Sequence, residues 1–296
     1  MSLTKIDWQP LQIKDPTNLK PAIGYLHRAA QFPAIMGNSL LPTADDDSQS
    51  SLEWVPELKS LVGAQIELAT TFRMGLNYEK FELHAYNETF SPISILPLTG
   101  QTQSQVMGYL KQLTQKLGGN PDKIEPISHY QLPGHEVDNK GVFQVTDPEH
   151  NREMVRYRTN IRHILEALKP YFSQTSDIRV WPHHFDTGMV IRVGKDKSIG
   201  VGMAIPDEFS PEPYFYINHW AQNIDPDYSD LSPLPGGGQW TAEKPPLAFL
   251  RMSQILKRDD VTQQLRQIAH FFEEGINTSL ELIDAKKFKM EGETTA

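Results

Sequence analysis

The amino-acid sequence predicts an α+β protein in which two groups of strands build a mostly antiparallel sheet packed against several helices. Apolar residues alternate with polar or small ones in two stretches, about 66–98 and 178–220, which is the period of a half-buried strand. Segments with helical spacing stand before, between and after these stretches instead of alternating with single strands. We expect a single domain over 1–296, whose two halves, at about 52–120 and 148–290, each contain a strand meander and a helix.

The first expected element is a helix at about 16–32, where Ile23, Leu26 and Ala30 share one face. The polar stretch 42–51 follows and contains three successive aspartates. It lacks the alternation and the glycine of a calcium-binding loop, so we expect a solvated loop there.

Three runs with a period of two predict a strand meander after Gly63: QIELATTFRM, KFELHAY and SPISILPL. The first of these runs contains two threonines and a phenylalanine in succession, which favour a strand over a longer helix. Apolar residues at helical spacing just before the meander indicate a short helix: Val55, Leu58, Leu61 and Val62.

Two helices are expected between the strand groups. The first has one apolar face and ends at two glycines: Val106, Tyr109, Leu110, Leu113, Leu117, then Gly118 and Gly119. Residues 124–146 are rich in proline and glycine and predict one short strand within a long loop. The second helix is expected to begin with Asp147 as the N-cap and Pro148 at its first position.

The second strand group consists of four runs: DIRVW, GMVIRV, SIGVGMAI and PYFYINHW. Residues 194–197 are expected to form a turn between two of them, and residues 221–245 a loop. Two helices should close the chain, one at about 246–257 and one that starts at Asp259 or Asp260.

Composition excludes several classes of protein. The formal charge of −9, without a run of Lys and Arg, argues against nucleic-acid binding, because neutralising phosphates needs a concentrated basic face. The chain contains no cysteine, so disulfides, thiol nucleophiles and thiolate zinc sites are excluded. No stretch has the run of about 18 apolar residues that a membrane-spanning helix needs, and the N-terminal stretch lacks the apolar segment of a signal peptide. We therefore expect a soluble, cytoplasmic protein that does not bind membranes.

The stretch WPHHFDTG, 181–188, is one candidate site because it concentrates metal-ligating side chains. His183, His184 and Asp186, together with His219 on another expected strand, are the types of residue that hold zinc or iron. On a regular strand the two adjacent histidines point to opposite faces, so sharing a metal requires a turn at this place. The alternative is that this stretch ends a strand and starts a turn whose polar atoms are satisfied locally.

The run PEPYFYINHW is the second candidate site. Its even-numbered positions share one strand face: Glu212, Tyr214, Tyr216, Asn218 and Trp220. A carboxylate, two phenols, an amide and an indole on one face form a polar and aromatic wall of the kind that lines small-molecule pockets. Asp186 and the histidines would lie near its rim. The alternative is a tyrosine-rich sheet face that is open to solvent or covered by a helix.

These two runs carry a resemblance to a known family. HHFD in 179–193 and EPYFY in 210–220 resemble runs of an uncharacterised bacterial family described as a domain of unknown function. The order of strands, "LPL" and helix over 66–117 is similar as well. His184 stands where that family has mostly aromatic residues or glycine, and the resemblance implies a fold rather than an activity.

Three functions remain open on the sequence alone. The first is a small-molecule-binding protein whose ligand contacts Glu212, Tyr214, Tyr216, Asn218, Trp220 and Asp186. The second is a metal-dependent hydrolase that uses His183, His184, Asp186 and His219. The third is a non-enzymatic protein-interaction module with Trp and Tyr at its interface.

Overall fold

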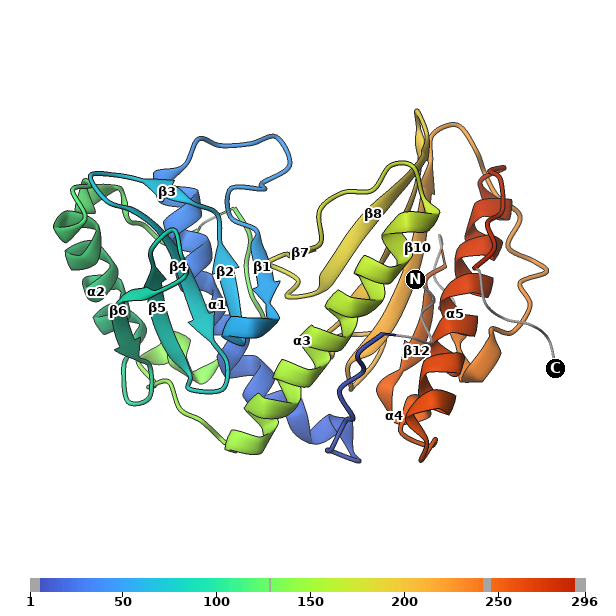
Figure 1. The fold of residues 1–296 in the computed structure, drawn as a ribbon, viewed down its shortest axis with the longest axis horizontal. Coiled ribbons are helices and arrows are strands. Elements are labelled where there is room, and N and C mark those ends of the chain that lie inside the picture. Colours follow the sequence, from blue (N-terminus) through green and yellow to red (C-terminus); the bar gives the residue numbers. More distant parts are fainter. Residues whose placement is uncertain (1–5, 128, 242–245, 291–296) are drawn as a thin grey trace. The chain divides into compact units, whose positions relative to one another are not determined.

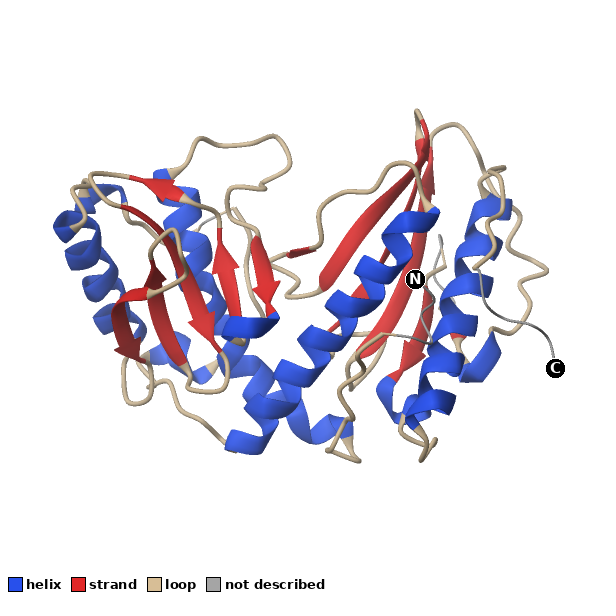
Figure 2. Ribbon diagram, in the orientation of Figure 1, coloured by secondary structure: helices blue, strands red, loops and turns tan. Residues whose placement is uncertain are grey.

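The computed structural model describes residues 6–127, 129–241 and 246–290 and divides the chain into two compact units. Unit I consists of Leu19–Val155 and Arg179–Phe185, and unit II consists of Met1–Asn18, Arg156–Ile178 and Asp186–Ala296. In each unit, helices pack on a sheet whose described strand pairs are all antiparallel (Figures 1 and 2), so the predicted α+β class is confirmed.

Unit I contains helices α1 (Lys20–Leu40) and α2 (Gln103–Lys116) and a sheet in the order β7-β1-β2-β4-β5-β6, with β3 paired to β4. The strands are β1 (Leu52–Val55), β2 (Ser60–Gly63), β3 (Ile66–Glu67), β4 (Thr71–Asn77), β5 (Glu82–Tyr86), β6 (Pro92–Pro97) and β7 (Arg179–Val180). Helix α1 packs against β2, β4 and α2. Helix α2 matches the prediction, and its N-terminus is fixed by a capping box between Thr102 and Gln105.

Helix α1 extends beyond its expected end near residue 32. It continues through Pro33 to Leu40, and the three residues after the proline are buried: Ala34, Ile35 and Met36. The burial of this apolar turn outweighs the hydrogen bond that Pro33 cannot donate.

The short helix expected before Gly63 was a wrong prediction. Residues 52–63 form a hairpin in which Trp54 pairs with Leu61. Its turn contains the 3-10 helix η3 (Pro56–Leu58) and Lys59 in the left-handed region, with φ 50°. The burial of Trp54 and Leu61 on the two strands prevails over the helical spacing.

Two other expected elements differ as well. The run QIELATTFRM contains two strands, because β3 folds back on β4 with Ile66 opposite Phe72. Residues 124–146 contain no strand among those described, and Val142 forms an isolated bridge with Thr102. Short 3-10 helices occur at η2 (Pro16–Leu19), η4 (Pro121–Lys123), η5 (Glu136–Asn139), η6 (Lys169–Tyr171) and η7 (Pro235–Gly237).

Unit II has a sheet in the order β11-β12-β10-β9-β8. Its strands are β8 (Thr187–Gly194), β9 (Lys197–Ala204), β10 (Tyr214–Ala221), β11 (Gln239–Trp240) and β12 (Ala248–Arg251). The helices are α4 (Met252–Ile255), α5 (Val261–Leu282) and the part of α3 (Pro148–Leu168) from Arg156 onward. Helix α3 begins at Pro148 as predicted, and Asp260 caps α5 by accepting a hydrogen bond from the N–H of Thr262.

The helix expected at about 246–257 begins instead as strand β12. Phe215 of β10 lies opposite Leu250, which is fully buried. Because this apolar segment pairs with β10 as a strand, helix α4 starts only at Met252. Helix α5 packs against β10, and the ring centroids of Phe215 and Phe272 lie 5.6 Å apart. Within residues 6–127, 129–241 and 246–290, no helix has the length and apolar character that crossing a bilayer requires.

Candidate functional site

Strand β10 carries the polar and aromatic residues that the sequence singled out. Tyr214, Tyr216, Asn218 and Trp220 occupy alternate positions of the strand. Exposure increases along this face, since Tyr214 is buried, Tyr216 is half-buried, and Asn218 and Trp220 are exposed. The residues between them are buried, and His219 is one of these.

Tyr214 and Asn218 on this face of β10, and Glu212 just before the strand, each have a hydrogen-bond partner nearby. Tyr214 donates to Asp207 Oδ2 at 2.5 Å, and Asn218 Oδ1 accepts from the N–H of Gly200 at 3.1 Å. The two carboxylate oxygens of Glu212 accept hydrogen bonds from Ser253 in the first turn of α4, one from Oγ at 2.6 Å and one from the backbone N–H at 2.7 Å. Glu212 therefore acts as a cap for α4, and none of these side chains lines either of the two cavities described below.

Tyr216 and Asp186 form a second tyrosine–aspartate pair in unit II. The Tyr216 hydroxyl donates to Asp186 Oδ2 at 2.6 Å. Burial, followed by the charge of Asp186, raises the pKa of Tyr216 well above its ordinary value, so this phenol stays protonated. The ring has room because Gly188 and Gly202 have no side chains. A Cβ on either glycine would lie 2.4 to 2.7 Å from Tyr216 atoms.

A similar arrangement occurs in unit I. The Tyr86 ring covers Gly75, and its hydroxyl lies 3.1 Å from both Ser60 Oγ and His84 Nδ1. The other ring nitrogen of His84 lies 2.8 Å from Glu82 Oε2. Ser60, His84 and Tyr86 are all buried. This hydroxyl–imidazole–carboxylate chain therefore acts as a packed polar network that links β2 to β5 across the intervening strand β4.

The stretch WPHHFDTG leaves β7 and enters a turn, as one of the two sequence interpretations predicted. The carbonyl oxygen of Pro182 accepts from His27 Nε2 at 2.9 Å and from Gln31 Nε2 at 2.8 Å. Phe185, at φ 57°, is fully buried and stacks on the His27 ring with centroids 4.7 Å apart. These contacts fasten the turn to α1 within unit I.

The predicted metal ligands do not gather into one group. His183 and His184 lie in unit I with ring centroids 4.3 Å apart, and His184 is exposed. Asp186 and His219 belong to unit II, where His219 Nε2 lies 3.1 Å from the Tyr228 hydroxyl. Across the described part of the chain, no group of three or more His, Asp or Glu side chains is placed to hold a metal ion.

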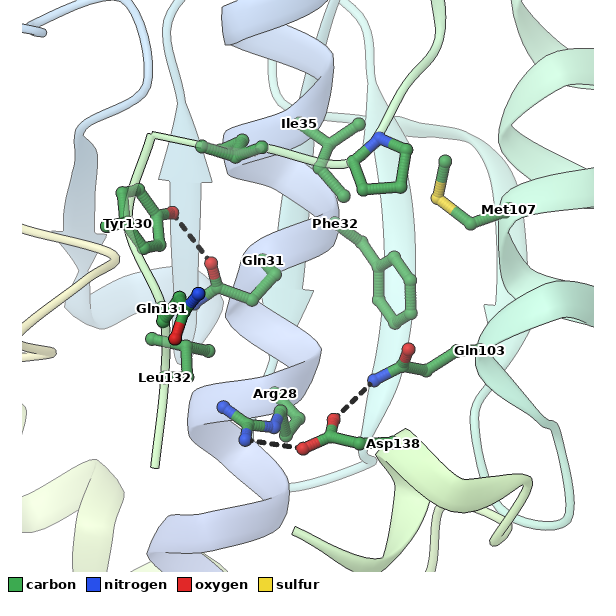
Figure 3. A pocket seen from close by; sticks show the side chains of 12 residues that line it. Arg28, Gln31, Phe32, Ile35, Gln103, Met107, Tyr130, Gln131, Leu132 and Asp138 are labelled. Atoms are coloured by element: carbon green, nitrogen blue, oxygen red, sulfur yellow. Dashed lines mark hydrogen bonds and ion pairs between the residues drawn. The ribbon is translucent and has the colours of Figure 1, made fainter. Parts of the chain in front are cut away.

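Unit I contains a cavity of about 360 Å³ that the sequence did not indicate (Figure 3). Helix α1 contributes one face of side chains at positions i, i+3, i+4 and i+7: Arg28, Gln31, Phe32 and Ile35. Helix α2 contributes Gln103 and Met107, and the segment that crosses between the helices contributes Pro126, Ile127, Tyr130, Gln131, Leu132 and Asp138. The cavity thus has an apolar part and a polar end.

Arg28 and Asp138 form the polar end of this cavity. Nη2 of Arg28 donates to Asp138 Oδ2 at 2.7 Å and to the carbonyl oxygen of Pro133. Gln103 Nε2 donates to the other Asp138 oxygen at 3.0 Å, and the N–H of His135 donates to Oδ2 at 2.9 Å. Burial alone would raise the pKa of Asp138, but these hydrogen bonds and the Arg28 charge outweigh it, so the pKa lies below its ordinary value.

Arg28 also has an unused donor. Its side chain is 5% exposed, and its Nε is buried with no hydrogen-bond partner among the described residues. A buried donor without a partner costs about 1–3 kcal/mol. On the far side of the cavity, the Tyr130 hydroxyl donates to Gln31 Oε1 at 2.7 Å and so holds the crossing segment against α1.

A signal for this cavity was present in the sequence but is weak. The helical face of Arg28, Gln31, Phe32 and Ile35 mixes polar and apolar residues inside a helix that is otherwise almost entirely buried. Such mixing marks a helix face that is covered by something other than close-packed apolar side chains. The partner Asp138 lies 110 residues away in the 3-10 helix η5, so no local pattern connects the two.

Comparison with protein-family models, with curated proteins and with solved structures finds no match to this chain.

Proposed function

We propose that the protein binds a small, uncharged and largely apolar molecule in the cavity between α1, α2 and the crossing segment of unit I. The observation that carries this proposal is a cavity of about 360 Å³ that is lined by Arg28, whose Nε donor is buried without a partner among the described residues. Ligand pockets typically measure about 300–1,000 Å³ and combine apolar walls with a few directed polar groups.

The charges at the polar end favour a neutral ligand. The guanidinium of Arg28 is balanced by Asp138 at 2.7 Å, so the two side chains together present no net charge. A ligand carboxylate would meet the Asp138 carboxylate, and like charges in a partly buried site repel. A carbonyl or hydroxyl oxygen can accept from Arg28 Nε without opposing that pair.

The apolar part favours a planar or branched hydrocarbon group. Phe32, Ile35 and Met107 form its walls, and Tyr130 closes one side through its hydrogen bond to Gln31. Burying apolar ligand surface against these groups contributes about 25 cal/mol per Å². Binding would therefore derive from the walls, and orientation from Arg28.

A thermal-shift screen with small neutral compounds tests the proposal, because a ligand that binds the native protein alone raises its unfolding temperature. We expect hits among amides and ketones, and a weaker effect from the carboxylate that has the same carbon skeleton. Met107→Trp fills the cavity and should abolish the shift. Gln115→Trp, at an exposed position of the same helix that does not line the cavity, is the matched control and should retain it.

Arg28→Lys keeps the positive charge but removes the Nε donor. A hydrogen bond to a charged group contributes about 1.5–3 kcal/mol, so the affinity for the best hit should fall by roughly 10- to 100-fold. A shift that persists in Met107→Trp, or a carboxylate that binds more tightly than its amide, would contradict the proposed site or its preference for neutral ligands.

A further inference from the structure

Unit II contains a second cavity with a different chemistry. It measures about 820 Å³ and lies between residues 171–174, the end of β8 with the turn that follows, and the segment after α5. Five of its twelve lining residues are cationic: Arg192, Lys195, Lys286, Lys287 and Lys289. No described acidic residue lines it, although the whole chain has 37 acidic and 28 basic residues and a charge of −9. Positive charge is thus concentrated at one place on an acidic protein.

Four of these cations lack a counter-charge. Within the described residues, Lys287 pairs with Glu281 at 2.7 Å, whereas Arg192, Lys195, Lys286 and Lys289 form no ion pair. The nearest acidic groups in sequence are Asp196 and Asp284, both exposed; Asp284 uses its backbone carbonyl to accept from Lys197 Nζ at 2.7 Å. Like charges held around one cavity repel one another, and an anion placed between them relieves that repulsion.

The backbone that carries the cations is held in place. Asn277 of α5 donates from Nδ2 to the carbonyl of Phe288 at 3.0 Å and accepts from its N–H at 2.9 Å. The Phe288 ring packs 4.8 Å from Phe172 and 5.9 Å from Tyr171. On the opposite wall, the N–H of Arg192 donates to the carbonyl of Gln174 at 2.9 Å. The cations therefore project from fixed positions around an aromatic cluster.

We propose that this basic cavity binds a small molecule that carries two or more phosphate groups. Four uncompensated cations around one concave site match several negative charges on a compact ligand. An extended polyanion such as nucleic acid would require a basic stripe or face, and the net charge of −9 opposes it. The neighbouring aromatic rings could also contact a planar group attached to the phosphates.

Calorimetric titration of the full-length protein with tripolyphosphate at low salt tests this proposal. Lys195→Ala combined with Lys289→Ala should lower the affinity by about 20-fold, since each exposed charge contributes about a factor of five at contact distance in water. The control, Lys111→Ala with Lys116→Ala on α2, removes the same charge from unit I and should change the affinity by less than about twofold.

Glu281→Gln provides a variant that gains affinity. It releases Lys287 from its ion pair, so tripolyphosphate should bind about threefold more tightly, a result that a merely structural cluster would not give. Raising the salt from low to high concentration should weaken binding, because exposed charges are screened over about 10 Å at 0.1 M.

The source of the phosphates is distinguished by comparing tripolyphosphate, ATP and adenosine. Equal binding of the first two indicates recognition of phosphates alone, and tighter binding of ATP adds a role for the aromatic cluster; both support the proposal. Absence of tripolyphosphate and ATP binding at low salt overturns it. Adenosine binding as strong as that of ATP, equal losses in the test and control variants, or tighter binding of oligothymidylate or hexaglutamate also overturns it. This site is separate from the cavity of unit I, so either proposal can fail alone.

Discussion

The packing of Tyr216 over glycine yields a prediction that can be worked out from the structure. In Gly188→Ala, the new Cβ would lie 2.4 Å from the Tyr216 hydroxyl oxygen and 3.2 Å from the carbonyl oxygen of Val201. The closer clash is with a single side-chain atom, and Tyr216→Phe removes that atom. The two substitutions should therefore compensate each other.

The expected magnitudes follow from the contacts. Overpacking of this kind costs about 1–3 kcal/mol, so Gly188→Ala alone should destabilise the protein by roughly 2 kcal/mol. Tyr216→Phe alone loses a hydrogen bond to a carboxylate at 2.6 Å, which costs about 1.5–3 kcal/mol. In the Y216F background, the cost of Gly188→Ala should drop below about 1 kcal/mol, which gives a coupling energy of about 1–2 kcal/mol.

Urea unfolding of the four proteins, followed by tryptophan fluorescence, measures this cycle. Gly202→Ala is the matched control, because its Cβ would lie 2.2 Å from the backbone carbonyl oxygen of Thr187 as well as near the Tyr216 ring. Tyr216→Phe cannot relieve a backbone clash, so that control should show no rescue. Additive costs for Gly188→Ala and Tyr216→Phe, within about 0.5 kcal/mol, would refute the described position of the ring.

Three further predictions concern single positions. Glu212→Ala removes the acceptor at the start of α4 and should lower the free energy of unfolding by about 1–2 kcal/mol in a denaturant titration. Gly37→Ala should destabilise the protein by more than about 2 kcal/mol, because its Cβ would lie 2.0 Å from the carbonyl oxygen of Gln49. Gly108→Ala has open space around its Cβ in α2 and should stabilise the protein by up to about 1 kcal/mol; thermal unfolding of the two variants measures the difference. Burial lowers the pKa of His219, so the unfolded chain binds its proton more readily; stability should fall as the pH drops below about 6.5, and His219→Gln should reduce that slope.

The sequence predicted the elements whose pattern and boundaries are local. Helix α2 followed from its apolar face and the two glycines at its end, and the starts of α3 and α5 followed from Pro148 and Asp260 at their N-termini. Strand β10 followed from its period of two, which also placed Tyr216 and Trp220 on one face. These features depend on residues within a few positions of one another.

Elements decided by distant partners were not predicted. Trp54 and Leu61 have spacing that suits a short helix, but burial on paired strands determines their conformation. Leu250 joins β12 because β10 offers it a neighbour 35 positions earlier, at Phe215. The cavity of unit I depends on Arg28 meeting a 3-10 helix more than a hundred residues away, and no local pattern reports such a contact.

The interleaved order of the two units has a consequence for synthesis of the chain. Unit I is finished by residues 179–185, which supply β7 opposite Leu52 and the Phe185 ring that stacks on His27, yet the ribosome makes 156–178 of the other unit first. A nascent chain that ends at residue 155 therefore has β1 as a bare sheet edge, the kind of edge on which other chains pair and aggregate. A truncation meant to isolate unit I must carry the later heptapeptide, either by linking it to residue 155 or by supplying it as a separate peptide.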